Sequence, residues 1–148
     1  QEVEKIGIDV SKYNVDHVAF QTFSSEDYEK MKLEFEAISH LEHEAQVNNR
    51  RVGVFKLNKL FQYKNNSITA IELLEPRSGQ VCTSHWEHAE FVINESYKEL
   101  MARYPDLSWD VSSIETPIYN HLKLKLNDLM QVKFHLMDIL ETIKLDVN

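Results

Sequence analysis

The chain reads VDHVAF at residues 15–20 and a similar stretch, WEHAEF, at residues 86–91. In both stretches an acidic residue precedes a histidine, and a phenylalanine follows the histidine at the third position. A repeat of this kind dictates the architecture of a chain, because each copy is one structural unit that packs against the other. The repeat therefore favours two related halves, with His17 and His88 at equivalent places.

Each stretch opens a similar order of elements, which we read from apolar periodicity, capping residues and β-branched or aromatic runs. In the first half we expect a strand at 17–23, a helix at 26–39, and strands at 51–57 and 67–75. In the second half we expect a strand at 86–93, a helix at 95–104, strands at 109–115, 121–126 and 130–136, and a last helix at 137–145. Residues 1–14 read as a loop or the end of a short helix.

Composition limits the class of protein. A length of 148 residues fits a single domain at 1–148, with module one at about 15–76 and module two at about 86–138. The net charge of -8 argues against a nucleic-acid groove or an anionic membrane surface. No apolar run approaches the roughly 18 residues of a membrane helix. The lone Cys82 indicates no oxidising compartment, so we expect a cytoplasmic protein.

Side-chain alternation places several polar residues on one face of each strand, opposite an apolar face. Four groups of residues are each expected to share one face of a strand: His17, Ala19 and Gln21; Ala70, Glu72 and Leu74; His88, Glu90 and Val92; and Gln131, Lys133 and His135. A polar-lined cup needs this arrangement. An ordinary solvated sheet face shows the same alternation, so the pattern permits a site without proving one.

The order DHVAF, VGVFKL, AIELLEP, WEHAEFVI and VKFHLMD resembles the vicinal oxygen chelate superfamily, and its YecM-like branch in particular. The resemblance runs from about Asp16 to Asp138. It implies an α+β fold in which two paired βαβββ-type modules form an open, cup-shaped mixed β-sheet with helices packed outside. It also implies a divalent metal held by the first and last strands of each module, at His17, Glu72, His88 and His135. The last position is commonly a glutamate in the superfamily, whereas this chain has a histidine.

This ligand set favours zinc slightly, with iron, manganese, nickel or cobalt as alternatives. The resemblance then implies a metal acting as a Lewis acid on a small molecule with neighbouring oxygens, as in an isomerase, lyase or dioxygenase. Glu90 would act as a general base or orient a ligand, while Lys133, Gln131 and Gln21 would contact the substrate. The alternatives are a module that sequesters a small ligand or metal, and a structural domain with an empty cup. Either a monomer or a homodimer is compatible with two modules in one chain.

Other candidate residues have simpler explanations. His40 and His43 are three apart at the end of the expected helix 26–39, among acidic residues, where a solvated helix end is the better interpretation. His85 reads as a loop or rim residue, and Cys82 has no partner at a recognisable spacing. The stripe expected to pack in the core comprises Tyr28, Met31, Leu33, Phe35 and Ile38.

Overall fold

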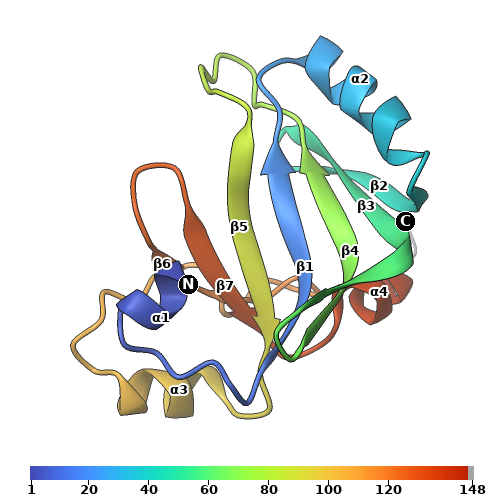
Figure 1. Ribbon diagram of the computed structural model, residues 1–148. Coiled ribbons are helices and arrows are strands. Elements are labelled where there is room, and N and C mark those ends of the chain that lie inside the picture. Colours follow the sequence, from blue (N-terminus) through green and yellow to red (C-terminus); the bar gives the residue numbers. More distant parts are fainter. Residues whose placement is uncertain (147–148) are drawn as a thin grey trace.

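The computed structural model describes residues 1–146, so residues 147 and 148 of the expected single domain lie outside the described residues (Figure 1). Its strands are β1 Asn14–Gln21, β2 Ser39–Val47, β3 Arg50–Tyr63, β4 Asn66–Leu74, β5 His85–Val92, β6 Leu122–Lys125 and β7 Gln131–His135. Its helices are α1 Glu2–Lys5, α2 Ser25–Phe35, α3 Tyr97–Arg103 and α4 Ile139–Thr142, followed by the 3-10 turn η1 Ile143–Leu145. None of the helices described is long and apolar enough to cross a membrane.

The strands form one mixed sheet in the order β2-β3-β4-β1-β5-β7-β6. β1 pairs with β4 in parallel, β5 pairs with β7 in parallel, and β1 and β5 run antiparallel side by side at the centre (Figure 1). The two halves of the sequence therefore meet along the two strands that carry the repeated stretches. This arrangement confirms the expected α+β fold, while the module boundaries stay a prediction.

The register at the centre of the sheet is symmetric. Val18 pairs with Ala89, and the flanking pairs are His17 with Glu90 and Ala19 with His88. Exchanging β1 for β5 thus maps His17 onto His88, as the repeated stretches indicate. The same exchange maps the parallel pairing of β1 with β4 onto that of β5 with β7.

The two faces of the sheet have different chemistry. One face carries an apolar core in which Tyr28 and Phe35 of α2 pack on Phe55, and Tyr97 and Leu100 of α3 pack among residues of β5, β6 and β7. The opposite face, which we call the cup face, carries the polar side chains of the central strands. The helix α4 and the turn η1 pack on this second face, because Ile139 and Ile143 contact Val54 and Ala70. The C-terminal elements therefore form part of the wall of the cup.

The expected strand at 109–115 is wrong except at one residue. Only Asp110 joins the sheet, through an isolated bridge to Lys123. The Asp110 carboxylate accepts hydrogen bonds from the backbone N–H and the hydroxyl of Ser112, at 2.9 and 2.6 Å. This local turn competes with ladder pairing and takes the chain out of the sheet. Module two consequently has one strand fewer than module one.

The expected helix at 26–39 is too long. It ends at Phe35, where the Ser39 hydroxyl donates to the Phe35 carbonyl at 2.5 Å, and β2 begins. His40 and His43 therefore lie on an edge strand instead of a helix end. Of the expected core stripe, Tyr28 and Phe35 are buried, whereas Leu33 and Ile38 are exposed.

Candidate metal centre

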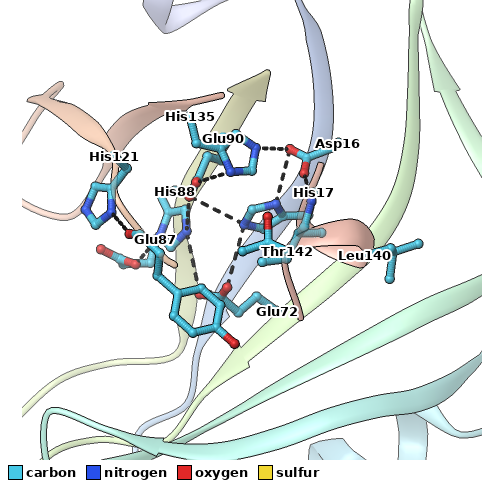
Figure 2. A network of polar contacts seen from close by, with 12 residues as sticks. Asp16, His17, Glu72, Glu87, His88, Glu90, His121, His135, Leu140 and Thr142 are labelled. Carbon is cyan, nitrogen blue, oxygen red and sulfur yellow. Dashed lines mark hydrogen bonds and ion pairs between the residues drawn. The ribbon is translucent and has the colours of Figure 1, made fainter. Parts of the chain in front are cut away.

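Four side chains on three strands converge at the centre of the cup face (Figure 2). His17 comes from β1, Glu72 from β4, and His88 and Glu90 from β5. His17 Nε2 lies 3.6 Å from Glu72 Oε2 and 3.6 Å from Glu90 Oε1. His88 Nε2 lies 3.7 Å from Glu72 Oε1 and 3.8 Å from Glu90 Oε1. A tetrahedral ion with ligand bonds near 2.1 Å would separate its donors by about 3.4 Å, so these spacings suit a metal.

Among the described residues, the Nε2 atoms of the two histidines in this cluster have no hydrogen-bond partner. His17 Nε2 and His88 Nε2 are buried, and the nearest acceptors lie beyond hydrogen-bonding distance. Buried polar atoms without partners are rare in folded proteins and each calls for an explanation. A cation between the two nitrogens and the two carboxylates satisfies all of them, so the residues present fit a metal ion.

Two β-bulges place a further acid beside each histidine. In the pairing of β1 with β5, Asp16 is an extra residue between the pairs Val15–Phe91 and His17–Glu90. Glu87 is the corresponding extra residue on β5, between the partners of Ala19 and Phe20. A bulge re-aims a side chain that alternation would send to the other face. Asp16 and Glu87 therefore reach the cup face next to the histidines that follow them.

Glu87 orients His88 through a hydrogen bond, and Asp16 forms an ion-pair contact with His17. Glu87 Oε2 lies 2.5 Å from His88 Nδ1, and Asp16 Oδ1 lies 3.2 Å from His17 Nδ1. A carboxylate on one ring nitrogen fixes the tautomer and presents the other nitrogen to a metal. Glu87 in turn accepts a hydrogen bond from the Gln131 amide, while the Asp16 carboxylate accepts one from the backbone N–H of Ile139 at 2.6 Å.

Alternation along the strands predicts neither Asp16 nor Glu87. The signal that could have found them is the acid before each histidine in the two repeated stretches.

His135 lies beside the cluster with both ring nitrogens occupied. Its Nδ1 is 2.7 Å from Glu90 Oε2, and its Nε2 is 3.0 Å from Asp16 Oδ1. Asp16, His17 and His135 form a second group whose geometry could hold a metal, but its members already contact one another directly. The structure thus brings His17, Glu72 and His88 together with Glu90, and places His135 at the edge of this cluster in contact with Glu90 and Asp16, while their role as ligands stays a prediction.

The sheet register explains the position of Glu90. Glu72 of β4 lies beside Ala19 of β1, and the equivalent pair in the second half is Lys133 of β7 beside Glu90 of β5. The position equivalent to Glu72 is therefore a lysine, which cannot bind a cation. The carboxylate comes instead from the adjacent strand.

The site is rich in buried acid groups. Burial alone lowers the pKa of His17, but the carboxylates of Asp16, Glu90 and Glu72 outweigh it and raise that pKa to about 9. Burial raises the pKa of Glu90, but the charges of His135 and His17 hold it well below its ordinary value. The Glu90 carboxylate therefore stays ionised and favours positive charge beside it, whether on the imidazoles or on a metal.

A cleft with a volume of about 990 Å³ opens from this cluster and includes Glu72, Glu90 and His135 in its lining. Lys133 also lines the cleft, and its charge lowers the pKa of Glu90. Gln131 lines it too, although its amide is bonded to Glu87. Gln21 is buried, and its amide nitrogen donates to the backbone carbonyls of Thr22 and Leu74 at 2.9 and 3.3 Å.

Comparisons with known proteins settle the family. The family model described as YecM protein matches residues 1–138. The chain belongs to the YecM family. Within it, the chain is 25% identical to Protein YecM of Escherichia coli over 99 residues, which cover 67% of this chain and 53% of that one. It is 26% identical to an uncharacterized protein of Haemophilus influenzae over 90 residues, which cover 61% of this chain and 47% of that protein. The chain thus spans about half the length of the curated YecM relatives it matches.

Solved structures place this YecM chain in a wider fold group. A structure described as Structural Genomics, Protein EC4020 has a TM-score of 0.77 at 22% identity and covers 98% of this chain and 83% of its own. Methylmalonyl-CoA epimerase of Streptomyces coelicolor, solved with 2-nitronate-propionyl-CoA, has a TM-score of 0.56 at 13% identity. The match covers 82% of this chain and 96% of the epimerase chain. These similarities show a shared vicinal oxygen chelate fold.

Proposed function

We propose that this chain binds one divalent metal ion through His17, Glu72, His88 and Glu90, and that it uses the ion to act on a small oxygen-rich molecule in the adjoining cleft. The observation that carries the proposal is the pair of buried, partnerless nitrogens, His17 Nε2 and His88 Nε2, facing two carboxylates. Two imidazoles and two carboxylates suit zinc, iron, manganese, nickel or cobalt better than magnesium or calcium.

The contacts favour Glu90 over His135 as the fourth ligand. Glu90 offers Oε1 to the cluster while its Oε2 is held by His135 Nδ1 at 2.7 Å. His135 then acts as a positioning residue that fixes the Glu90 carboxylate, and Asp16 fixes His135 from the other side. Because both its nitrogens are engaged, His135 would have to give up its contact with Glu90 or with Asp16 to bind a metal itself.

The cleft gives the site its second requirement, space for a substrate at the ion. A bound ion of this kind supplies a Lewis acid for two neighbouring oxygens of a small molecule. The Lys133 ammonium lines the same cleft and offers positive charge to an oxyanion beside Glu90. Methylmalonyl-CoA epimerase has the same fold and is solved with a CoA derivative, which supports a small-molecule ligand for this cleft.

Elemental analysis after expression in metal-supplemented medium tests the proposal. We expect one ion per chain in the unmodified protein, and loss of the ion in His88→Gln and Glu90→Gln. The matched variant His135→Gln removes a buried imidazole that we do not assign as a ligand, and we expect roughly 10- to 100-fold weaker binding but a stoichiometric ion at saturating metal. An unmodified protein without stoichiometric metal would refute the proposal, and loss of the ion only in His135→Gln would return His135 to the ligand set.

Turnover assays then separate an enzyme from a protein that only sequesters its ligand. The metal-loaded protein would be assayed against 2-oxo acids, thiohemiacetals and catechols, each of which offers neighbouring oxygens. Turnover that disappears with Glu90→Gln supports an enzyme. Saturable binding of such a molecule without turnover supports sequestration.

A further inference from the structure

Two arginines line the cleft away from the metal cluster, and neither has an acidic partner. Among residues 1–146, the arginines that form ion pairs are Arg51 and Arg103, whereas Arg50 and Arg77 form none. Both of these unpaired arginines line the same 990 Å³ cleft as Glu72 and Glu90. Unpaired cations in a cleft of a chain with a net charge of -8 are unusual, because acidic side chains are plentiful.

Arg50 is held in place by a neutral side chain. Its Nη1 donates to Gln21 Oε1 at 2.9 Å, and its Nε is buried without a hydrogen-bond partner. Gln21 is itself fixed, since its amide nitrogen donates to the carbonyls of Thr22 and Leu74. A guanidinium that is oriented but left with free donors is arranged to receive an acceptor from outside the chain.

Arg77 adds a second positive charge next to Arg50. Burial, and then the nearby charge of Arg77, lower the pKa of the Arg50 guanidinium. Glu87 and Glu72 offset part of this effect, and an anion bound at Arg50 would offset more of it. Arg77 is exposed on the segment that joins β4 to β5, so its side chain can close over a bound group.

The sheet register gives the separation from the metal cluster. The Arg50 guanidinium contacts Gln21, which pairs with Leu74, and Leu74 lies two residues beyond Glu72 on β4. Two residues of strand span roughly 7 Å. An extended molecule with its paired oxygens at Glu72 and Glu90 would reach the arginines with a group roughly four or five bonds away.

We propose that Arg50 and Arg77 form an anion subsite, which binds a carboxylate or phosphate on the distal end of the same small molecule whose oxygens meet the metal. This inference rests on the proposed function, because the metal cluster defines the other end of the molecule. It assigns the substrate class as a small anion with two oxygenated ends. Gln21 then acts through Arg50 as a positioning residue and does not contact the substrate.

Two probe molecules of equal chain length test the subsite. 2-Oxoglutarate and 2-oxopentanoate present the same pair of oxygens to a metal, and only 2-oxoglutarate has a distal carboxylate. Isothermal titration calorimetry on the metal-loaded full chain should show 2-oxoglutarate binding roughly 10- to 100-fold more tightly, as expected of charge-assisted hydrogen bonds. Equal binding of the two probes would overturn the proposal.

Variants assign the preference to the arginines. Arg50→Gln should reduce the preference to within about threefold with its metal content unchanged, because the distal charge loses its partner. Arg77→Gln, at an exposed position that carries little risk for folding, should reduce it partially. Arg103→Gln removes a guanidinium outside the cleft and should leave the preference intact. A preference that survives both Arg50→Gln and Arg77→Gln would contradict the subsite.

A metal-free titration keeps the subsite distinct from the proposed function. Inorganic phosphate and acetate would be titrated into the chelator-treated full chain and into its Arg50→Gln variant. Binding that Arg50→Gln abolishes supports the subsite even if the unmodified protein holds no metal, and the tighter of the two anions identifies phosphate or carboxylate as the preferred group. Stoichiometric metal without any binding of either anion overturns the subsite and leaves the metal proposal intact.

Discussion

At the scale of single residues, the site depends on acids that occupy the extra positions of two bulges. Asp16 and Glu87 each hold the Nδ1 side of the following histidine, which leaves Nε2 of His17 and His88 facing the cluster. Their own remaining oxygens are bonded to the backbone of Ile139 and to the Gln131 amide. The histidines are therefore oriented before any ion arrives.

Glu87→Gln tests this orientation. The substitution keeps the shape of the side chain but removes the charge that fixes the His88 ring, so we expect metal affinity to fall roughly 10- to 100-fold. Competition with a chromophoric chelator measures the change. Glu34→Gln removes a carboxylate from the exposed face of α2 and should have no effect. An unchanged affinity in Glu87→Gln would show that the contact does not orient His88.

Part of this site could be predicted from the sequence. Alternation along the strands places His17, Glu72, His88 and Glu90 on one face, and the structure has all four there. Alternation cannot place Asp16 and Glu87, because a bulge breaks the period of two along the strand. Nor can it distinguish Glu90 from His135, since that choice depends on which nitrogen contacts which oxygen across three strands.

At the scale of elements, Arg51 links β3 to its neighbours on the face opposite the cup. Its guanidinium contacts the Glu75 carboxylate at 2.6 Å just beyond β4, and it also pairs with Glu29 of α2. The same group lies over the ring of Tyr28, 4.4 Å from its centroid. One side chain therefore fastens α2 to two strands.

This link predicts a pH dependence of stability. Hydrogen bonds from Arg51 hold the pKa of Glu75 below its ordinary value of 4.5. A carboxyl with a lowered native pKa stabilises the fold above its unfolded pKa, and that contribution is lost as the pH falls through the native pKa. We expect Glu75→Gln to lower the free energy of unfolding at pH 7, and the difference from the unmodified protein to shrink between roughly pH 5 and pH 3. Urea denaturation across this range measures it.

A matched control for this experiment is Glu34→Gln, which removes an acid from the exposed side of α2. If the difference between Glu75→Gln and the unmodified protein stays constant down to pH 3, the contact with Arg51 does not hold the native pKa of Glu75 low.

The expected elements were correct where apolar periodicity is strong and wrong where local polar contacts decide. β1, β4, β5 and β7 overlap the expected strands, because buried alternating residues define them. β2 was missed because an edge strand with charged, exposed side chains has the composition of a solvated helix end. The expected strand at 109–115 is wrong because the Asp110 carboxylate accepts a hydrogen bond from the backbone N–H of Ser112. That N–H is therefore not paired with a neighbouring strand.

At the scale of the whole molecule, the metal cluster joins both halves of the chain. His17 and Glu72 come from the first half, and His88 and Glu90 from the second, while Asp16 also binds the first residue of α4. An ion bound as proposed would hold the two central strands together and, through Asp16, would steady the C-terminal wall of the cup.

Metal binding should consequently stabilise the fold. An ion present at 100 times its dissociation constant adds about 2.7 kcal/mol to the free energy of unfolding. For a chain of this length that corresponds to a rise in Tm of roughly 5–10 °C. Differential scanning calorimetry with and without a chelator measures the shift, and His17→Gln should abolish it. An equal Tm in both conditions, at stoichiometric metal content, would contradict the link between the cluster and the two halves.

The two bulges also bear on how such a site can arise. Removing Asp16 from β1, or Glu87 from β5, would leave the pairs on either side in regular antiparallel register, with each remaining side chain still on its present face. A regular antiparallel pair of strands that carries the two histidines would therefore differ from β1 and β5 by only one inserted residue in each strand. A substitution cannot add a residue to a strand. Insertions and deletions in β1 and β5, more than substitutions, are therefore the changes that create or remove the acid beside each histidine.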